Sequence, residues 1–229
     1  MISEKLETYK NMIYGEKRDV FFRFYELLKE YNARFNLTSI TEESEIFTKH
    51  FLDSVAGESL FKKNASVAEI GSGAGFPSLP LKIVRPDLKF TLVESTGKKC
   101  EFLRVAAKEL ALENVEIVNA RAEELARDAR YREKFDHCCA RAVARLNTLA
   151  EYCVPFIKKG GSFIAYKGDV AEEAEEAKRA LKILGCGRTK IFSCQLETAG
   201  KRALFVADKT SSTPALYPRG NGKERKKPL

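Results

Sequence analysis

From residue 66 onward, short apolar runs alternate with stretches of helical periodicity, and this alternation restricts the fold more than any other feature of the sequence. The apolar runs are SVAEIG (66–71), KFTLVE (89–94), VEIVNA (115–120), FDHCCA (135–140) and GSFIAYK (161–167). Strands separated by helices pair in parallel, and the helices cover both faces of the sheet. Two further runs, at 189–196 and 201–208, have no helix between them, so we expect a terminal antiparallel hairpin strand. The sequence therefore predicts an α/β, Rossmann-like fold with a mostly parallel sheet.

The segment before residue 65 has helical periodicity and no strand pattern. Apolar residues spaced by three and four predict an amphipathic helix over 17–35 with an aromatic-rich face, and a second helical stretch follows at about 42–60. We expect residues 1–64 to form a helical extension packed on a core of residues 65–209. The aromatic face is interpreted as the docking surface for that core, in preference to a base-stacking platform.

The basic charge is concentrated at one end of the chain. The formal net charge is +8, and residues 210–229 contain five Lys or Arg against one Glu, which is half of the excess. Because this segment is also rich in Pro and Gly, we expect a basic irregular tail that becomes ordered on binding. A basic excess fits an anionic partner such as nucleic acid, although a solvated tail explains the charge alone equally well.

Several protein classes are disfavoured by composition. No apolar run reaches the roughly 18 residues that span a bilayer, and the first ten residues are polar, so a cytoplasmic protein without a membrane partner is expected. The six cysteines form no CxxC pair, and there are only two histidines. We therefore expect reduced, buried cysteines and no metal site. A monomer is the expected oligomeric state.

Three glycines follow the first strand, in the turn Gly71-Ser72-Gly73-Ala74-Gly75-Phe76. The dinucleotide fingerprint GxGxxG would need a glycine where Phe76 stands, and no GxxxxGK[ST] phosphate loop is present. Glu69 precedes the turn, where its charge would repel a pyrophosphate but attract an ammonium group. This variant favours a cofactor without phosphates.

Two further elements follow successive strands and border the same crevice. Glu94 ends the second strand, where a carboxylate can accept hydrogen bonds from ribose hydroxyls, and residues 121–124 (RAEE) follow the third. Each has an ordinary alternative, since Glu94 could cap the next helix and Glu123 could be a solvated helix residue. Together with the glycine turn they predict S-adenosylmethionine as the cofactor.

The sequence at this point resembles the bacterial 16S ribosomal RNA guanine-N7 methyltransferases, also called glucose-inhibited division protein B. The resemblance spans nearly the whole chain. It is carried by NLTS (36–39), HFLDS (50–54), GSGAGFP (71–77), IVRP (83–86), ES (94–95), GKK (97–99), ENV (113–115), RAEE (121–124), RA (141–142), YKG (166–168), YPR (217–219) and KKPL (226–229).

The resemblance implies a class I methyltransferase fold and methyl transfer to N7 of one guanine in the decoding-region hairpin of 16S rRNA. The partner would be 16S rRNA or the small ribosomal subunit. By carry-over, cofactor-binding residues would be Gly71, Phe76, Glu94, Ser95, Ala122, Glu123 and Arg141, beside Glu69, Gly73 and Gly75 of the turn itself. One departure is mild: many members have Asp where Glu69 stands here.

The expected chemistry agrees with what the sequence lacks. Guanine N7 carries an in-plane lone pair and no proton, so methyl transfer needs placement and no general base or covalent intermediate. No certain catalytic residue is therefore expected. Arg141 and Arg145 follow the fourth strand and Lys167 ends the fifth. These cations suit RNA contacts, with an ion pair or solvated rim as the alternative; Arg141 could equally shape the cofactor pocket.

The remaining candidates lie at the two ends of the chain. Arg219, Lys226 and Lys227 are expected to bind RNA from the tail. His50 alone would be interpreted as a core or capping histidine, but the resemblance places it at the border of the active site, so it joins Arg141 and Lys167 as a positioning candidate. His137, inside the fourth strand, is expected to be structural.

Two other functions remain open from the sequence. One is a methyltransferase acting on another RNA or on a small molecule. The other is a non-catalytic ribosome-assembly factor that binds the cofactor. The sequence does not distinguish free rRNA, an assembly intermediate and the mature subunit as substrates.

Overall fold

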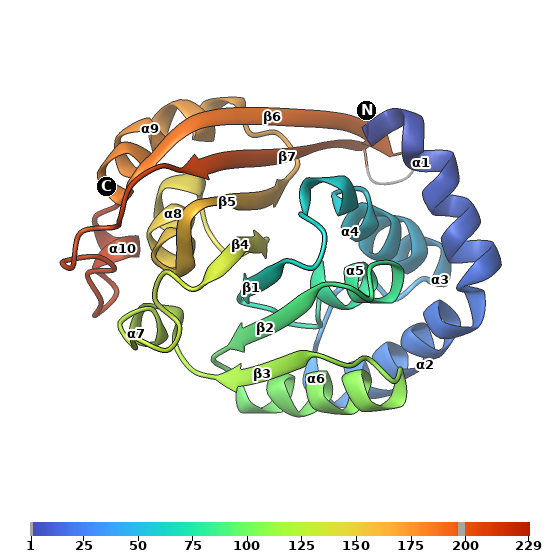
Figure 1. Ribbon diagram of the computed structural model, residues 1–229. Helices are drawn as coiled ribbons and strands as arrows, with labels where there is room; N and C mark the ends of the chain where they lie inside the picture. The colour runs from blue at the N-terminus through green and yellow to red at the C-terminus, as the bar shows by residue number, and fades with distance from the viewer. Residues whose placement is uncertain (1, 197–199) are drawn as a thin grey trace.

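The chain forms a seven-stranded sheet with the order β3-β2-β1-β4-β5-β7-β6, seen nearly edge-on in Figure 1. The computed structural model describes residues 2–196 and 200–229. The strands are β1 (Ser66–Ile70), β2 (Lys89–Glu94), β3 (Val115–Asn119), β4 (Phe135–Arg141), β5 (Ile157–Lys167), β6 (Cys186–Leu196) and β7 (Gly200–Lys209). All pairings among β1 to β5 are parallel, so the carboxyl ends of these strands share one edge.

The last two strands form the expected hairpin. β7 runs antiparallel both to β5 and to β6 and lies between them. It is the single reversed strand among those described. The prediction of a mostly parallel α/β sheet with a terminal antiparallel strand is confirmed.

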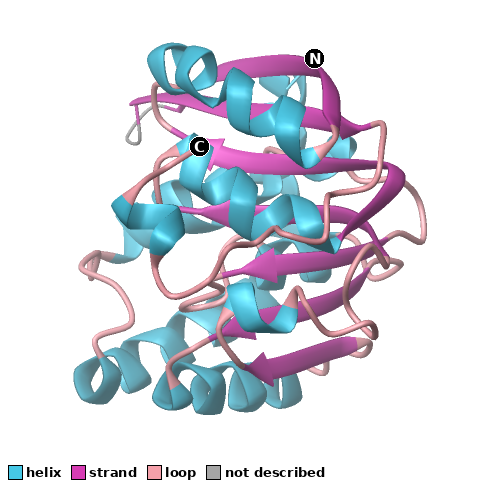
Figure 2. Ribbon diagram, turned by 90° about the vertical axis from the view of Figure 1, so that its left-hand side faces the viewer, coloured by secondary structure: helices cyan, strands magenta, loops and turns pink. Residues whose placement is uncertain are grey.

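Helices cover both faces of this sheet (Figures 1 and 2). The N-terminal helices pack with α5 and α6 on one face, while α8 and α9 pack together on the other. The helical elements are α1 (Ile2–Asn11), η1 (Met12–Glu16), α2 (Arg18–Phe35), α3 (Glu43–Glu45), η2 (Ile46–Leu52), α4 (Asp53–Val55), η3 (Glu58–Leu60), α5 (Ser78–Val84), α6 (Gly97–Glu109), α7 (Ala122–Leu125), α8 (Leu146–Cys153), η4 (Val154–Phe156), α9 (Ala171–Leu184) and α10 (Lys223–Lys226).

The aromatic face of α2 is part of the main core. Phe24 is fully buried, and its ring lies 5.3 Å from that of Phe51 and 5.5 Å from that of Phe76, centroid to centroid. The buried residues of the N-terminal helices form one cluster with residues of β1, β2 and β4. The aromatic face of α2 therefore packs toward the sheet, and the extension shares its core with the sheet.

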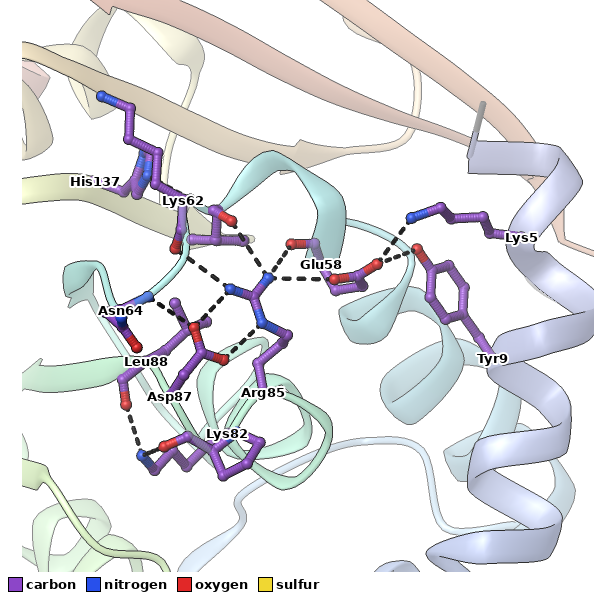
Figure 3. A network of polar contacts seen from close by, with 12 residues as sticks. Lys5, Tyr9, Glu58, Lys62, Asn64, Lys82, Arg85, Asp87, Leu88 and His137 are labelled. Carbon is purple, nitrogen blue, oxygen red and sulfur yellow. Dashed lines mark hydrogen bonds and ion pairs between the residues drawn. The ribbon is translucent and has the colours of Figure 1, made fainter.

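A polar network near the amino-terminal end of β2 also links the extension to the sheet domain (Figure 3). Arg85 follows α5, and its guanidinium donates to Asp87 at 2.7 Å and to the Glu58 carboxylate at 3.3 Å. Lys5 and Tyr9 of α1 reach the same Glu58 from the other side, each at 3.1 Å. The network thus joins α1 and η3 of the extension to the turn between α5 and β2.

The C-terminal tail is irregular apart from α10, and it contacts the core at several points. Arg132 donates to the backbone oxygens of Tyr217 and Thr213, at 2.9 Å each. The carboxylate of Glu151 on α8 is fully buried and forms an ion pair with Arg219 at 2.7 Å. Fixed partners on the core therefore hold the tail, which the low apolar content of the segment did not indicate.

Three further predictions can be compared with the described residues. All six cysteines are buried and unpaired, as expected. His137 is buried, with Ser162 on one ring nitrogen at 2.8 Å and the Lys62 N–H on the other at 3.1 Å, as expected for a structural histidine. Within residues 2–196 and 200–229, no helix has the length and apolar character needed to cross a membrane.

Candidate active site

The glycine turn after β1 has a backbone course that side chains disfavour. Gly71, Gly73 and Gly75 all have positive φ angles, of 68°, 56° and 84°. A Cβ on Gly75 would lie 2.5 Å from a side-chain carbon of Leu79, so this glycine also lets α5 pack closely. Glu94 at the end of β2 accepts the Gly73 N–H at 3.0 Å. The carboxylate expected at the ribose therefore also fixes the turn.

A hollow of about 400 Å³ opens beside this turn. One wall is the turn itself, and the facing wall comes from residues 37–50 of the N-terminal extension. Its lining residues are Leu37, Thr38, Ile40, Lys49, His50, Gly71, Ser72, Gly73, Ala74, Phe76, Lys99, Arg141, Ala142 and Arg202. Five of the expected site residues thus lie together: Gly71, Gly73, Phe76, Arg141 and His50.

A second, smaller hollow of about 90 Å³ adjoins the first at Gly71. It lies over the ends of β1, β2 and β3, and it contains three further expected residues, Ser95, Ala122 and Glu123. Tyr152 of α8 and Arg225 of α10 complete its lining. The tail therefore contributes a side chain to the crevice, which the sequence did not predict.

A buried carboxylate of the extension binds two arginines that line the first hollow. Asp53, at the start of α4, is 3% exposed and receives Arg141 of β4 at 2.9 Å and Arg202 of β7 at 2.7 Å. One negative group thus balances two guanidinium groups that come from separate strands. Because Asp53 belongs to the extension, this cluster fixes the extension against the sheet at the pocket.

His50 is held in one protonation state and one tautomer. Its Nδ1 lies 3.0 Å from a guanidinium nitrogen of Arg141, and its Nε2 lies 2.8 Å from the Thr38 hydroxyl oxygen. Burial, reinforced by the charge of Arg141, lowers the pKa of His50 to about 3, so the ring is neutral near pH 7. Since a guanidinium can only donate, Nδ1 accepts and Nε2 bears the proton.

The ring of Phe76 packs against both His50 and Arg141. Its ring stacks on the His50 ring with centroids 4.5 Å apart, and the Arg141 guanidinium carbon lies 4.9 Å from its centroid. A glycine at this position, as in dinucleotide sites, would remove both contacts. The bulky residue in the turn therefore orders the positioning candidates, and Arg141 shapes the pocket.

Glu69 lies behind the hollow and does not line it. Its side chain is fully buried, and neither carboxylate oxygen has a hydrogen-bond partner among the described residues. Burial raises the pKa of Glu69 to about 8, against opposing effects of Ser78 and Arg141. The expected ammonium-binding carboxylate is thus a buried acid two residues before the glycine turn.

The first hollow is positively charged. Its lining contains Lys49, Lys99, Arg141 and Arg202 and no carboxylate. Of these, Lys49 forms an ion pair with Glu45, while Arg141 and Arg202 share Asp53. An anionic ligand such as a nucleic-acid segment fits this lining.

The other cations expected to touch RNA have protein partners. Lys167 is largely buried and donates to the Ala144 carbonyl at 2.8 Å and to Glu173 at 2.7 Å. Arg145 is exposed and forms an ion pair with Glu176 at 2.8 Å. In both cases the structure favours the ion-pair alternative, because α9 presents an acidic face to this rim.

The tail cations differ among themselves. Arg219 is bound to buried Glu151 and lines a third hollow beside Arg121 and Arg127. Lys226 and Lys227 are exposed at the end of α10. Of these three residues, Lys226 and Lys227 therefore keep the solvent access that phosphate contacts need.

Sequence reasoning missed Asp53, Thr38 and Arg202 as members of the site. The first two lie in the segments HFLDS and NLTS, which supported the resemblance but were not assigned roles. Arg202 had no signal, since it stands in an ordinary strand pattern. The two cysteines of β4, Cys138 and Cys139, are fully buried outside both hollows, and burial holds the pKa of each thiol well above its usual range.

Comparisons with known proteins give a consistent result. The family GidB, described as rRNA small subunit methyltransferase G, matches residues 18–204. The Brevibacillus brevis protein named ribosomal RNA small subunit methyltransferase G is 49% identical over 217 residues, covering 93% of this chain and 91% of that protein. A Staphylococcus aureus protein of the same name is 44% identical over 232 residues, covering 100% and 97%.

The fold also matches a solved structure. A SAM-dependent O-methyltransferase from Thermotoga maritima superposes with a TM-score of 0.56 at 14% identity, covering 82% of this chain and 73% of that chain. At this identity the similarity concerns the fold alone.

Proposed function

This chain belongs to the rRNA small subunit methyltransferase G family, and we propose that it methylates N7 of one guanine in the decoding-region hairpin of 16S rRNA. Family membership makes it an S-adenosylmethionine-dependent rRNA methyltransferase. The choice of guanine and of N7 rests on the resemblance of its sequence segments to the guanine-N7 enzymes.

The residues around the glycine turn fit S-adenosylmethionine. The turn departs from the dinucleotide fingerprint, because Phe76 fills the third glycine position. Ser95, Ala122 and Glu123 would hold the adenosine part in the smaller hollow, which meets the larger one at Gly71. When bound, the cofactor would supply an electrophilic methyl group on a positively charged sulfur for transfer to N7.

The chain's own groups position the purine and remove no proton. N7 has a free lone pair, so a general base is unnecessary. His50 agrees with this, because it is neutral and both of its nitrogens are engaged. The observation that supports the proposal most directly is the cationic hollow beside the glycine turn, which can receive an anionic RNA segment next to the cofactor crevice.

We also propose that the protein acts as a monomer in the cytoplasm. Gel filtration with light scattering at working concentrations measures the oligomeric state, and a stable dimer would contradict it.

The proposed reaction can be tested with the purified full chain and methyl-labelled S-adenosylmethionine. Free 16S rRNA, assembly intermediates and mature small subunits are offered in parallel, and the label is mapped to a nucleotide. We expect one labelled guanine, and no label when that guanine is replaced by 7-deazaguanine, which lacks N7. Label on another atom or another RNA would refute the assignment. In cells, deletion of the gene should abolish the corresponding N7-methylguanine.

A further inference from the structure

Thr38 closes a chain of three directed hydrogen bonds at the wall of the hollow that faces the glycine turn. Arg141 donates to Nδ1 of His50, and the tautomer that this imposes makes Nε2 donate to the Thr38 oxygen at 2.8 Å. The backbone N–H of Ile40 donates to the same oxygen at 3.1 Å. Both lone pairs of the hydroxyl are therefore used.

A hydroxyl whose lone pairs are both occupied can act only as a donor. Its single proton has no acceptor among the interactions recorded for the described residues, and Thr38 lines the first hollow. Because Thr38 lines this hollow as well as a neighbouring one between α2 and residues 40–46, its hydroxyl is a neutral O–H donor that an acceptor on a ligand bound in the first hollow can satisfy. This donor role is set by Arg141, which is itself fixed by Asp53.

We propose that the Thr38 hydroxyl donates a hydrogen bond to O6 of the target guanine and thereby makes the enzyme prefer guanine over adenine. The inference deepens the proposed function and rests on it. On the edge of the purine that bears N7, guanine presents two acceptors, N7 and O6, whereas adenine presents N7 and an amino donor. A donor-only group beside O6 stabilises guanine and opposes an amino group.

O6 is the partner that leaves the reaction intact. A hydrogen bond to N7 would occupy the lone pair that attacks the methyl carbon, while one to O6 leaves N7 free. The charged groups of the hollow discriminate less well, because Lys49, Arg141 and Arg202 are shared with carboxylates and Lys99 has a long flexible stem. The oxygen of Thr38 already accepts two hydrogen bonds, so its hydroxyl can form one more, as a donor.

The test pairs a change in the protein with a change in the RNA. Full-length wild type, Thr38→Ser and Thr38→Val are assayed on a 16S rRNA substrate with either guanine or 2-aminopurine at the methylated position. 2-Aminopurine keeps N7 and lacks O6. We expect wild type and T38S to lose about 10- to 100-fold in kcat/KM when O6 is removed, since one buried group is left unpaired. T38V should lose a similar factor in kcat/KM relative to wild type on the guanine RNA. On the 2-aminopurine RNA, T38V and wild type should have similar kcat/KM.

Binding measurements separate this role from a structural one. The Kd of each variant for S-adenosylhomocysteine should be unchanged, and the Kd of T38V for the guanine RNA, measured without a methyl donor, should rise several-fold. Equal losses by T38V on both RNAs would overturn the inference, and so would wild type that uses 2-aminopurine as well as guanine. The second result does not depend on the folding of any variant. If wild type methylates no guanine N7, the proposed function fails first.

Discussion

Replacing Asp53 by Asn should strongly destabilise the protein. The carboxylate is 3% exposed and accepts three hydrogen bonds from two arginines, at 2.7, 2.8 and 2.9 Å. Asn is almost the same size, so no cavity is created. It removes the negative charge, and its amide NH₂ faces guanidinium donors, so at least one arginine loses its acceptor.

The expected loss follows from the burial of the cluster. Breaking a buried ion pair by removing one partner costs about 3–5 kcal/mol, because the remaining charge stays desolvated. Arg141 is the main contributor, since its side chain is 9% exposed, whereas that of Arg202 is 25% exposed and can be partly rehydrated. For a chain of this size, such a loss corresponds to a fall in melting temperature of roughly 6–20 °C.

Thermal unfolding followed by circular dichroism measures this effect, and Glu176→Gln is the matched control. That change removes the same charge from the exposed Arg145–Glu176 pair, where water replaces the lost contact, so the melting temperature should barely move. If D53N melted as close to wild type as E176Q does, the claim that two arginines need this buried counter-charge would be refuted.

Three further predictions follow from the turn, the buried acid and the tail. Gly75→Ala should lower the melting temperature more than Gly160→Ala. Both glycines have φ of 84°, so both substitutions cost backbone strain of about 1–2 kcal/mol. A Cβ at position 75 would also lie 2.5 Å from a carbon of Leu79, whereas a Cβ at position 160 would meet no atom within 4 Å. The pKa of Glu69 is raised from 4.5 to about 8, so the folded state holds a proton that the unfolded chain has lost. The contribution of Glu69 to stability should therefore fall as pH rises from about 4.5 to about 8, so the unfolding free energy of wild type relative to Glu69→Gln in urea titrations should fall over the same range. Arg219→Ala leaves a buried carboxylate unpaired, so limited proteolysis should release the tail, whereas exposed Lys227→Ala should not change the digest.

Much of the crevice could be predicted because its residues follow strand ends. Gly71, Ser95, Ala122 and Arg141 lie at the end of, or within three residues after, four strands whose carboxyl ends meet at one edge once the sheet is parallel. Alternation of strands and helices was enough to predict that meeting. No knowledge of side-chain contacts was needed.

Contacts between distant segments could not be predicted in the same way. Arg202 reaches Asp53 across 149 positions of sequence only because β7 inserts beside β5. Lys167 was expected to face RNA, but the acidic face of α9 places Glu173 within its reach. Sequence periodicity reports which face of a helix is apolar; it does not report which distant cation a surface acid will meet.

The position of β7 has a consequence for the order in which the protein becomes competent during synthesis. Among the described residues, β6 pairs with β7 alone, and β7 supplies Arg202 to the first hollow, to which the extension contributes residues between 37 and 50. Since a chain emerges from its N-terminus, the edge of the sheet and the wall of the pocket are completed by the same late strand. A nascent chain that still lacks β7 would have a glycine turn and a His50 but only part of the cationic wall. The cationic lining of the first hollow is therefore complete only after β7 has joined the sheet.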